Sequence, residues 1–349
     1  MRHWPTKPYR VFLAAAIVPA LVAAAHADRV RTEAGIGYTG EIVGVAEGGL
    51  VVKEGNRRKR IVPLADIRDI RADKYPDLKR AEEAYAKGVG GNPKAFDEAG
   101  KLYQGLLRKG APAWLRVVVQ WRMYKLYAES GRATEALDAY LEMARNSPRL
   151  VADLNLPVPD ESDHQANKAM LTKVERAVAG AAGKPYADAL RNFRVALLLL
   201  EGKPEEVLPL LEPLLVSSDP KVRTSAMIRK LELLLATGET DEAAKWLDQM
   251  EAAVGDSGKA EMAYWRGRVH LAGGKHLEAA LEFMKVPILY PAADHSRTAD
   301  ALWRAGQALR AVKAPREEIV SVYNEAVRKC PGTAGAERAR RELARLGSK

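Results

Sequence analysis

The sequence predicts a mainly α-helical protein, an α-solenoid of antiparallel helix pairs preceded by a small all-β, barrel-like module. Two observations support this fold class. Between Arg29 and Arg71, apolar and polar residues alternate with a period of two, which is typical of strands. From residue 76 onward the apolar spacing is helical, and Gly202, Gly238 and Gly274 follow one another at intervals of 36 residues. A constant period of this length, with a glycine turn between two helices, indicates a repeat array.

The composition indicates a folded chain with ample material for a core. Of the 349 residues, 47% are hydrophobic and 29% are charged, which excludes a disordered chain and a protein with many membrane spans. The single cysteine, Cys330, excludes an internal disulfide framework, an iron–sulfur cluster and a zinc site that needs several cysteines. The net charge of +10 falls to +7 if Arg2, Lys7 and Arg10 are removed with an N-terminal targeting segment.

Residues 1–27 have the pattern of a secretion signal peptide. The first ten residues carry three positive charges and no acid, and an apolar run from Val11 to Ala25 follows. This run is broken by a proline and is short for a membrane span. Small residues at Ala25 and Ala27 fit a signal-peptidase site, so we expect cleavage between Ala27 and Asp28 and export to the periplasm. The alternative is an uncleaved membrane anchor. No cysteine lies at the cleavage point, which excludes lipid attachment there.

Residues 28–72 are expected to form the small β module. The segments 38–45, 50–53, 60–62 and 67–70 read as short strands, separated by turns at Gly48–Gly49 and at 54–56. Closing such strands into a barrel would remove exposed sheet edges. The order of the glycine turns and the final PLADIRDI run resembles the small SH3-like or Sm-like barrels.

The densest positive run of the chain lies in this module and consists of Arg57, Arg58, Lys59 and Arg60. It could contact an anionic surface, an acidic partner or nucleic acid. It could equally be a solvated hairpin tip and edge strand that charge keeps soluble. Over residues 28–72 the net charge is only +2. Export makes nucleic acid the least favoured of the functional readings.

Residues 73–349 are expected to form the helical array, and the array resembles the tetratricopeptide repeat (TPR) family. Small residues let paired helices approach, an aromatic residue fills the space between repeats, and proline ends the second helix. The motif positions hold Tyr127, Gly131, Ala136, Tyr140 and Pro148 in the pair at 117–148, and Gly267, Gly274, Ala279, Phe283 and Pro291 in the pair at 260–291. More degenerate pairs are expected at 188–220, 224–255 and 299–331, the last with one extra residue in its turn.

Other parts of the array depart from this motif. Residues 76–110 are expected to form a first helix pair with Tyr85, Ala95 and Tyr103 in its core. Residues 149–164 are rich in proline and aspartate and read as a loop. The stretch 165–184 is either a degenerate helix pair or a single helix that closes over the groove. Residues 334–346 read as a capping helix, which an array needs to shield its last apolar face.

The final seventy residues resemble bacterial envelope TPR proteins more narrowly. The run from Leu281 to Pro291 and the PGT that follows Cys330 are similar to the repeats of two such proteins, the Tol-Pal-associated cell-division coordinator and the outer-membrane assembly lipoprotein. This resemblance implies an envelope protein that binds other proteins.

The sequence offers no support for catalysis. It contains no nucleophile elbow, phosphate loop or dinucleotide fingerprint, and its six histidines lack the spacing of a zinc-binding helix. We therefore expect no catalytic residues, no metal and no cofactor, and we read Cys330 as a partly buried thiol.

In the TPR family the first helix of each pair lines a concave groove. Carrying the inward positions of that helix onto this chain predicts a partner-binding set made of Trp121, Lys125, Asn192, Tyr264, Arg268, Trp303 and Arg310. Its aromatic and cationic members would suit an extended peptide with acidic groups. The alternative is that the aromatic residues pack between neighbouring repeats.

The sequence thus predicts an exported, non-enzymatic scaffold that binds an envelope protein or extended peptide in the groove of the solenoid. The alternative is a structural envelope protein whose basic hairpin docks on an anionic surface or polymer. Salt separates them, because docking by surface charge is screened and apolar groove binding is not.

Overall fold

The computed structural model describes residues 27–347 except 56–57, 109, 153, 155, 158, 160–162, 254–257 and 292. Residues 1–26, which carry most of the expected signal peptide, lie outside the described residues, as does Arg57. The first described strand begins at Asp28, directly after Ala27, and the Asp28 carboxylate accepts a hydrogen bond from the Ile42 N–H at 2.9 Å. No helix in the described part combines the length and the apolar character that crossing a membrane requires.

The N-terminal module is a five-stranded antiparallel sheet with the strand order β4-β3-β2-β1-β5. Register shifts in β2 and β1 bend the sheet, so that alternate residues such as Leu50 and Val52 face one core. Glu47 and Gly48, in the β2–β3 turn, both have positive φ, as a two-residue hairpin turn requires. The strands are β1 (Asp28–Thr32), β2 (Gly37–Ala46), β3 (Gly49–Glu54), β4 (Arg58–Pro63) and β5 (Ile67–Arg71), with a one-turn helix η1 (Leu64–Asp66) between the last two.

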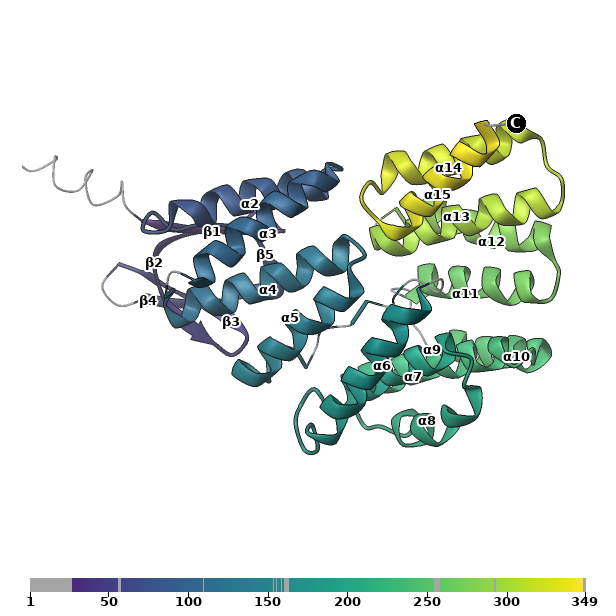
Figure 1. The fold of residues 1–349 in the computed structure, drawn as a ribbon, viewed down its shortest axis with the longest axis horizontal. Coiled ribbons are helices and arrows are strands. Elements are labelled where there is room, and N and C mark those ends of the chain that lie inside the picture. Colours follow the sequence, from purple (N-terminus) through teal and green to yellow (C-terminus); the bar gives the residue numbers. More distant parts are fainter. Residues whose placement is uncertain are drawn as a thin grey trace, which may run out of the picture.

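The described remainder holds fourteen α-helices that pack in sequence order, so the predicted mainly helical fold is confirmed. Figure 1 shows the pairs following one another around the molecule. The helices are α2 (Pro76–Val89), α3 (Pro93–Arg108), α4 (Ala113–Glu129), α5 (Ala133–Asn146), α6 (His164–Ala179), α7 (Ala187–Leu200), α8 (Leu208–Leu215), α9 (Pro220–Ala236), α10 (Thr240–Ala253), α11 (Lys259–Ala272), α12 (His276–Leu289), α13 (His295–Ala311), α14 (Arg316–Lys329) and α15 (Ala334–Gly347), with a one-turn helix η2 (Pro204–Glu206) before α8.

The glycines that the period of 36 identified do occupy turns. Gly202, Gly238 and Gly274 have φ between 68° and 79°, which residues with a Cβ rarely adopt. In the α13–α14 turn, where the sequence needs an extra residue, Lys313 takes a positive φ of 56° instead. Gly267 has a different role, because a Cβ there would lie 2.7 Å from the Phe283 ring. This close approach lets α11 and α12 pack tightly.

The middle of the array differs from the expected pattern. The stretch 165–184 contains one described helix, α6, which packs against α7. The second helix of the expected pair at 188–220 is shortened to α8, only eight residues long. Pro209 near its start and Pro213 inside it explain the short length, because proline has no N–H to donate and clashes with the preceding turn.

The solenoid turns far enough for its two ends to meet. A Cβ at Gly91, in the α2–α3 turn, would lie 2.7 Å from the Pro331 side chain in the α14–α15 turn. A Cβ at Gly131 would lie 3.5 Å from the Ala334 side chain, and one at Gly332 would lie 3.6 Å from the Phe96 ring. In Figure 1 the tips of α2 and α3 accordingly point toward α14 and α15. We call these contacts the seam.

A buried ion pair fastens the sheet to the helices. Both carboxylate oxygens of Glu82 (α2) accept hydrogen bonds from Arg122 (α4), from Nε at 2.9 Å and from Nη2 at 2.7 Å. Glu82 also accepts from the Tyr103 hydroxyl at 2.6 Å and from the Ile70 N–H of β5 at 3.2 Å, and Arg122 donates to the Arg68 carbonyl at 2.9 Å. Burial and the charge of Glu82 hold the pKa of Tyr103 well above its usual value, so its hydroxyl remains a donor.

We predict that Glu82→Gln destabilises the protein strongly, because it leaves the Arg122 charge buried without a counterion. The expected loss is about 3–5 kcal/mol in the free energy of unfolding, measured by urea denaturation followed by circular dichroism. Glu83→Gln is the matched control, since the Glu83 side chain is half exposed and its ion pair with Lys79 spans 3.9 Å. Equal stability of the two variants would show that the buried pair does not fasten the sheet.

Candidate functional site

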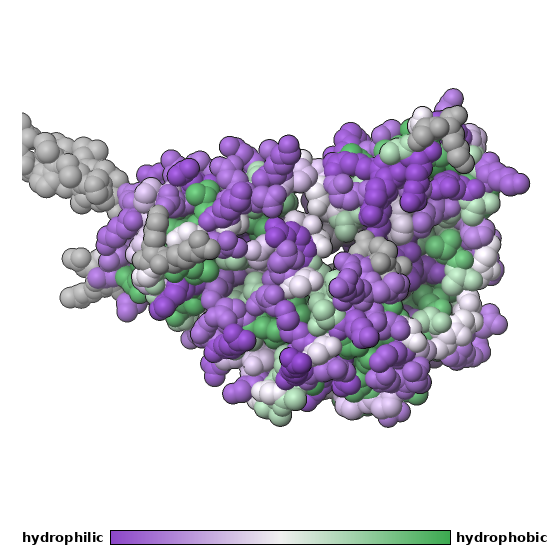
Figure 2. Space-filling model, viewed as in Figure 1, coloured by the Kyte–Doolittle hydropathy of each residue, from purple (hydrophilic) through white to green (hydrophobic). Residues whose placement is uncertain are grey.

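The closed turn of helices surrounds a cavity of about 960 Å³. Figure 2 shows the corresponding face hollowed in its middle, between the half that carries the sheet and the half that carries α11–α15. The inner helices of successive pairs contribute the wall, as the family resemblance led us to expect. The lining comes from α4, α7, α9, α11, α13 and α15 and from the loop after α5.

One side of the cavity is apolar. It is formed mainly by α7 and by residues of the α5–α6 loop. Small and large apolar side chains line the cavity along the length of α7. The apolar members are Ala189, Phe193, Ala196, Leu199 and Leu200 from α7, and Leu154, Leu156, Pro157 and Pro159 from the loop. An apolar wall of this extent can bury the apolar side of a ligand.

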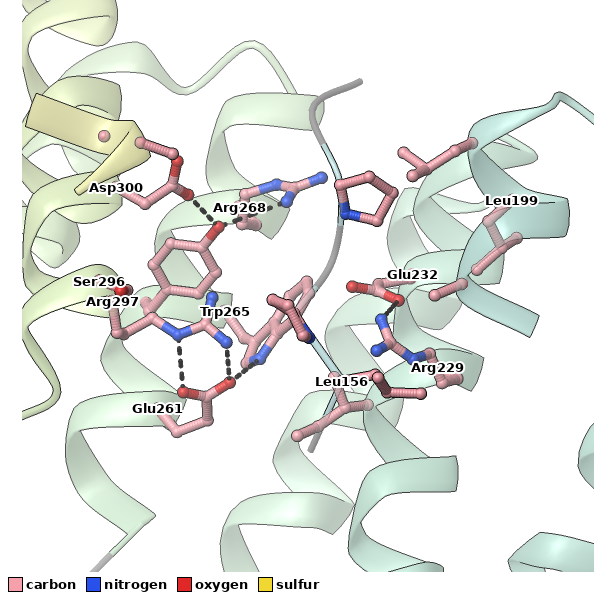
Figure 3. A pocket seen from close by; sticks show the side chains of 18 of the residues that line it. Leu156, Leu199, Arg229, Glu232, Glu261, Trp265, Arg268, Ser296, Arg297 and Asp300 are labelled. Carbon is pink, nitrogen blue, oxygen red and sulfur yellow. Dashed lines mark hydrogen bonds and ion pairs between the residues drawn. The ribbon is translucent and has the colours of Figure 1, made fainter. Parts of the chain in front are cut away.

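The opposite side is charged and is held rigidly by contacts between repeats. Glu261 of α11 accepts two hydrogen bonds from Arg297 of α13, at 2.9 and 2.8 Å, and one from the Trp265 indole at 2.7 Å. The Tyr264 hydroxyl donates to Asp300 at 2.6 Å. Figure 3 shows these side chains on one side of the cavity. We call Glu261, Tyr264, Arg297 and Asp300 the polar wall.

Asp300 is the anionic centre of the polar wall. Arg304 donates to it at 2.8 Å and Arg338 of α15 at 3.0 Å. Burial alone would raise the pKa of Asp300, but the Arg304 charge, the hydrogen bonds from Tyr264 and Arg304 and the Arg338 charge outweigh it and lower the pKa to about 2. Asp300 is therefore ionised at neutral pH and joins α11, α13 and α15.

Arg268 differs from the other cavity arginines. Arg229 pairs with Glu232 at 2.6 Å, Arg297 with Glu261, and both Arg304 and Arg338 with Asp300. Among the described residues, Arg268 pairs with no carboxylate. Its guanidinium lies 5.4 Å from the centre of the Trp265 ring and 3.5 Å from the Tyr264 hydroxyl. The described part of the site thus presents a cation beside an aromatic ring, with no carboxylate paired to it.

Three of the predicted partner-binding residues line the cavity: Asn192, Tyr264 and Arg268. Asn192 is nine-tenths buried, and its side-chain oxygen accepts no hydrogen bond from any residue that the structure describes. Tyr264 is almost fully buried, and its hydroxyl donates to Asp300. The inward positions predicted for α7 and α11, in the middle of the array, thus do line the cavity.

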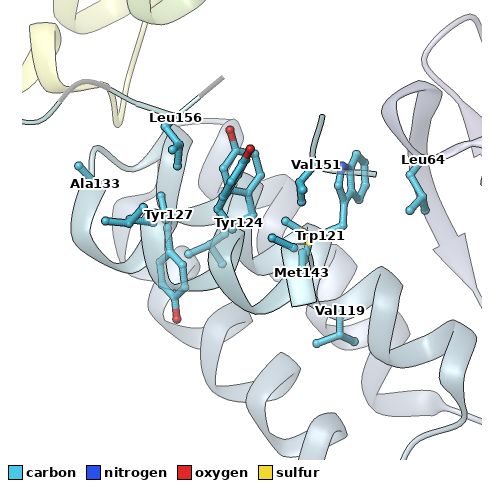
Figure 4. Packing of buried hydrophobic residues seen from close by; sticks show 14 of the residues in the cluster. Leu64, Val119, Trp121, Tyr124, Tyr127, Ala133, Met143, Val151 and Leu156 are labelled. Atoms are coloured by element: carbon cyan, nitrogen blue, oxygen red, sulfur yellow. The ribbon is translucent and has the colours of Figure 1, made fainter. Parts of the chain in front are cut away.

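The other predictions do not place residues in the cavity, because both ends of the array are covered. Trp121 is 1% exposed and packs in the core where the sheet meets α4, as Figure 4 shows, so its assignment to the binding set is wrong. Lys125 pairs with Glu129 at 3.6 Å. Trp303 lies under α15, with the Arg338 guanidinium 4.9 Å from its ring centre, and the exposed Arg310 pairs with Glu342 of α15. Neither residue lines the cavity.

The basic run lies away from the cavity, on a sheet edge. Arg58, Lys59 and Arg60 are exposed on β4, which ends the strand order. The register places them opposite Glu54, Lys53 and Val52, and Arg60 approaches Glu54 at 3.8 Å. Charge at this position suits the protection of an edge strand, and it remains available for contact with an anionic surface.

Metal and thiol chemistry find no support in the described residues. They contain no group of three or more His, Cys, Asp or Glu side chains placed to hold a metal ion. Cys330 is buried, and burial together with the Asp294 charge raises the pKa of its thiol to about 11. The thiol therefore stays protonated and unreactive at neutral pH.

Glu261 and Asp300, which the sequence analysis did not predict, show a regular spacing to their partners. The missed residues Glu261 and Asp300 each pair with a residue one repeat period away, since Glu261–Arg297 and Tyr264–Asp300 both span 36 positions. Complementary groups separated by the repeat period could have been sought in the sequence. The apolar residues of the loop gave no such signal.

We predict that Asp300 makes stability depend on acid pH. Its folded pKa of about 2 lies below the unfolded value, so the contribution is complete above about pH 5 and is lost as the pH falls toward 2. The stability difference between the wild type and Asp300→Asn should shrink by about 2 kcal/mol over that range, measured by urea denaturation at each pH. Asp138→Asn is the control, because Asp138 is half exposed. A difference that is independent of pH would contradict the ionised centre.

The chain matches no protein-family model and no curated protein. The functional conclusion therefore rests on the cavity itself, which has an apolar wall, a polar wall held by ion pairs, and Arg268, which pairs with no carboxylate of the described residues.

Proposed function

We propose that this protein is an exported, non-enzymatic scaffold of the TPR type that holds an extended segment of an envelope protein in its central cavity. The single observation that carries the proposal is the cavity of about 960 Å³, lined by the inner helices of successive pairs and walled by apolar residues on one side and charged residues on the other. A cavity of this size and mixed character suits a peptide with apolar side chains and a few acidic groups.

The helix pairs support the TPR assignment. The Gly267–Phe283 contact and the similar approach of Gly306 to Tyr323 are the small-to-aromatic fits that the repeat motif implies. For the N-terminal module, the antiparallel strand order and the bent β2 support the small SH3-like or Sm-like barrel. The N-terminal sequence supports export to the periplasm and cleavage after Ala27.

The state of the two carboxylates in the polar wall, Asp300 and Glu261, supports a binding role over a catalytic one. A general acid or base works best with a pKa near the operating pH, whereas Asp300 is held at about 2. Glu261 is fully engaged by Arg297 and Trp265. These carboxylates serve to fix the wall and to orient the residues around Arg268.

We predict that Arg268→Ala weakens capture of the partner about tenfold, the usual consequence of losing one charge-assisted hydrogen bond. The measurement is in-cell crosslinking of the tagged protein, followed by quantitative mass spectrometry of the envelope fraction. Arg266→Ala is the matched control, since Arg266 lies on the same helix, pairs with Glu251 and does not line the cavity. Circular dichroism checks that both variants fold.

Two results would contradict the proposal. One is a partner whose yield is the same for the wild type, Arg268→Ala and Arg266→Ala. The other is that no protein is crosslinked in the cavity and the tagged protein instead binds the envelope fraction. In that result, added salt releases the protein, and the double substitution Lys59→Glu with Arg60→Glu abolishes its binding. That second result would favour the alternative of a structural protein docked through its basic edge strand.

A further inference from the structure

An apolar stripe runs along the outer face of α12. Leu277, Leu281 and Ile288 are 55%, 60% and 62% exposed, and Met284 between them is half-buried. Steps of four, three and four residues place these four side chains on one face of a helix. We call them the α12 stripe. None of them lines the cavity, and in Figure 1 α12 lies on the side of the array away from the sheet.

The equivalent positions of the neighbouring outer helices are polar. α10, α12 and α14 each have fourteen residues, and the eighth residue of each is buried, namely Leu247, Phe283 and Tyr323. In this register the α12 stripe occupies the second, sixth, ninth and thirteenth positions. The second, sixth and ninth residues of α10 are the exposed Asp241, Lys245 and Asp248. All four positions of α14 are exposed and hold Glu317, Ser321, Asn324 and Arg328.

The repeat architecture therefore does not require apolar residues at these positions. Outer faces of helices that contact water are normally polar, as they are in α10 and α14. An apolar stripe on α12 alone indicates a surface that another molecule covers.

The charges beside the α12 stripe identify what covers it. Glu278 is exposed, and Lys285 is 43% exposed although it also binds Glu282 at 2.5 Å. Glu278 and Lys285 are seven residues apart, which is about two helical turns, so they lie along the same side of the stripe. When two copies of a helix pack antiparallel about a two-fold axis, the same side of each copy meets. An axis between residues 281 and 282 places Glu278 of each copy opposite Lys285 of the other.

The same axis also interleaves the apolar side chains. It brings the two copies of Leu281 together and places Leu277 of one copy between Met284 and Ile288 of the other. The stripe and the charges beside it thus fit one common register. Such a surface is complementary to itself, which is the requirement for a symmetric dimer interface.

We propose that a second copy of this chain covers the α12 stripe, with α12 packed antiparallel on its symmetry mate and Glu278 paired with Lys285 between the copies. The charged residues of α12 are Glu278, Glu282 and Lys285, two acids against one base, which suits this pairing better than an anionic lipid surface. One helix from each copy buries less area than the roughly 1,600 Å² of a standard interface, so the dimer should dissociate in the micromolar range.

This inference goes beyond the proposed function and does not depend on it. No residue of α12 lines the cavity, so the pairing leaves the lining of both cavities unchanged. A dimer would present two cavities to one partner and would raise the avidity of capture.

The first test is analytical ultracentrifugation of the purified protein over a range of concentrations. The wild type should form a reversible dimer. Leu281→Asp should raise the dissociation constant at least about thirtyfold, because it removes the central apolar contact and brings two carboxylates together. Ser321→Asp is the matched control, since Ser321 is the exposed sixth residue of α14, and it should leave the dissociation constant unchanged. Circular dichroism checks that each variant folds.

The second test reverses the two charges separately. Glu278→Lys and Lys285→Glu should each raise the dissociation constant at least about tenfold, because each places like charges opposite one another at two places. An equimolar mixture of the two variants should dimerise as the wild type does, since one variant then supplies two positive charges and the other two negative ones. These positions are exposed, so the reversals test the dimer even if Leu281→Asp does not fold.

Four results would overturn the proposal. A wild type that is monomeric at every concentration excludes the second copy, and a dimer that Leu281→Asp leaves intact uses another surface. Single reversals without effect, or a mixture of them that stays monomeric, exclude the antiparallel register. A monomeric wild type that binds vesicles of anionic phospholipid, and loses that binding with Leu281→Asp, would assign the α12 stripe to a lipid surface. Partner capture in the cavity is measured separately and stands or fails on its own.

Discussion

The ion pair between Glu82 and Arg122 is the interaction on which the rest of this structure depends. It joins β5, α2 and α4 within one hydrogen-bonded group, and Tyr103 adds α3. Because both charges are buried, the pair is stable only when every oxygen and nitrogen finds a partner, which fixes the position of the sheet on the first helices. Each later helix pair stacks on the one before it, so the direction of the array is set here.

Closure of the array converts a surface groove into a cavity. At the seam, the contact between the α2–α3 and α14–α15 turns requires a glycine, since a Cβ at Gly91 would lie 2.7 Å from the Pro331 side chain. The ends of the array are also covered, by the sheet over Trp121 and by α15 over Trp303. As a result, Trp121 and Trp303 lie outside the cavity although α4 and α13 contribute other residues to its lining.

The polar wall links stability to binding. Its ion pairs run from α11 to α13 and from α13 to α15, and thereby fix these three helices relative to one another. Arg268 lies among these paired charges, beside the aromatic ring of Trp265, and pairs with no carboxylate that the structure describes. A rigid wall of this kind lowers the entropic cost of binding, because its side chains are already ordered before a ligand arrives.

The sequence alone determined the periodic features of this protein. Strand alternation, helical spacing and the glycine turns at Gly202, Gly238 and Gly274 follow from local backbone preference, and they predicted the sheet and the helix pairs. The resemblance to the TPR family, carried onto this chain position by position, predicted Asn192, Tyr264 and Arg268, which line the cavity. Tertiary structure decided which residues that are distant in the sequence lie in contact. Examples are the burial of Trp121, the contacts of the seam and the position of Leu156 in the cavity lining. They depend on how much the array rotates with each repeat. That rotation arises from packing contacts that no local sequence pattern encodes.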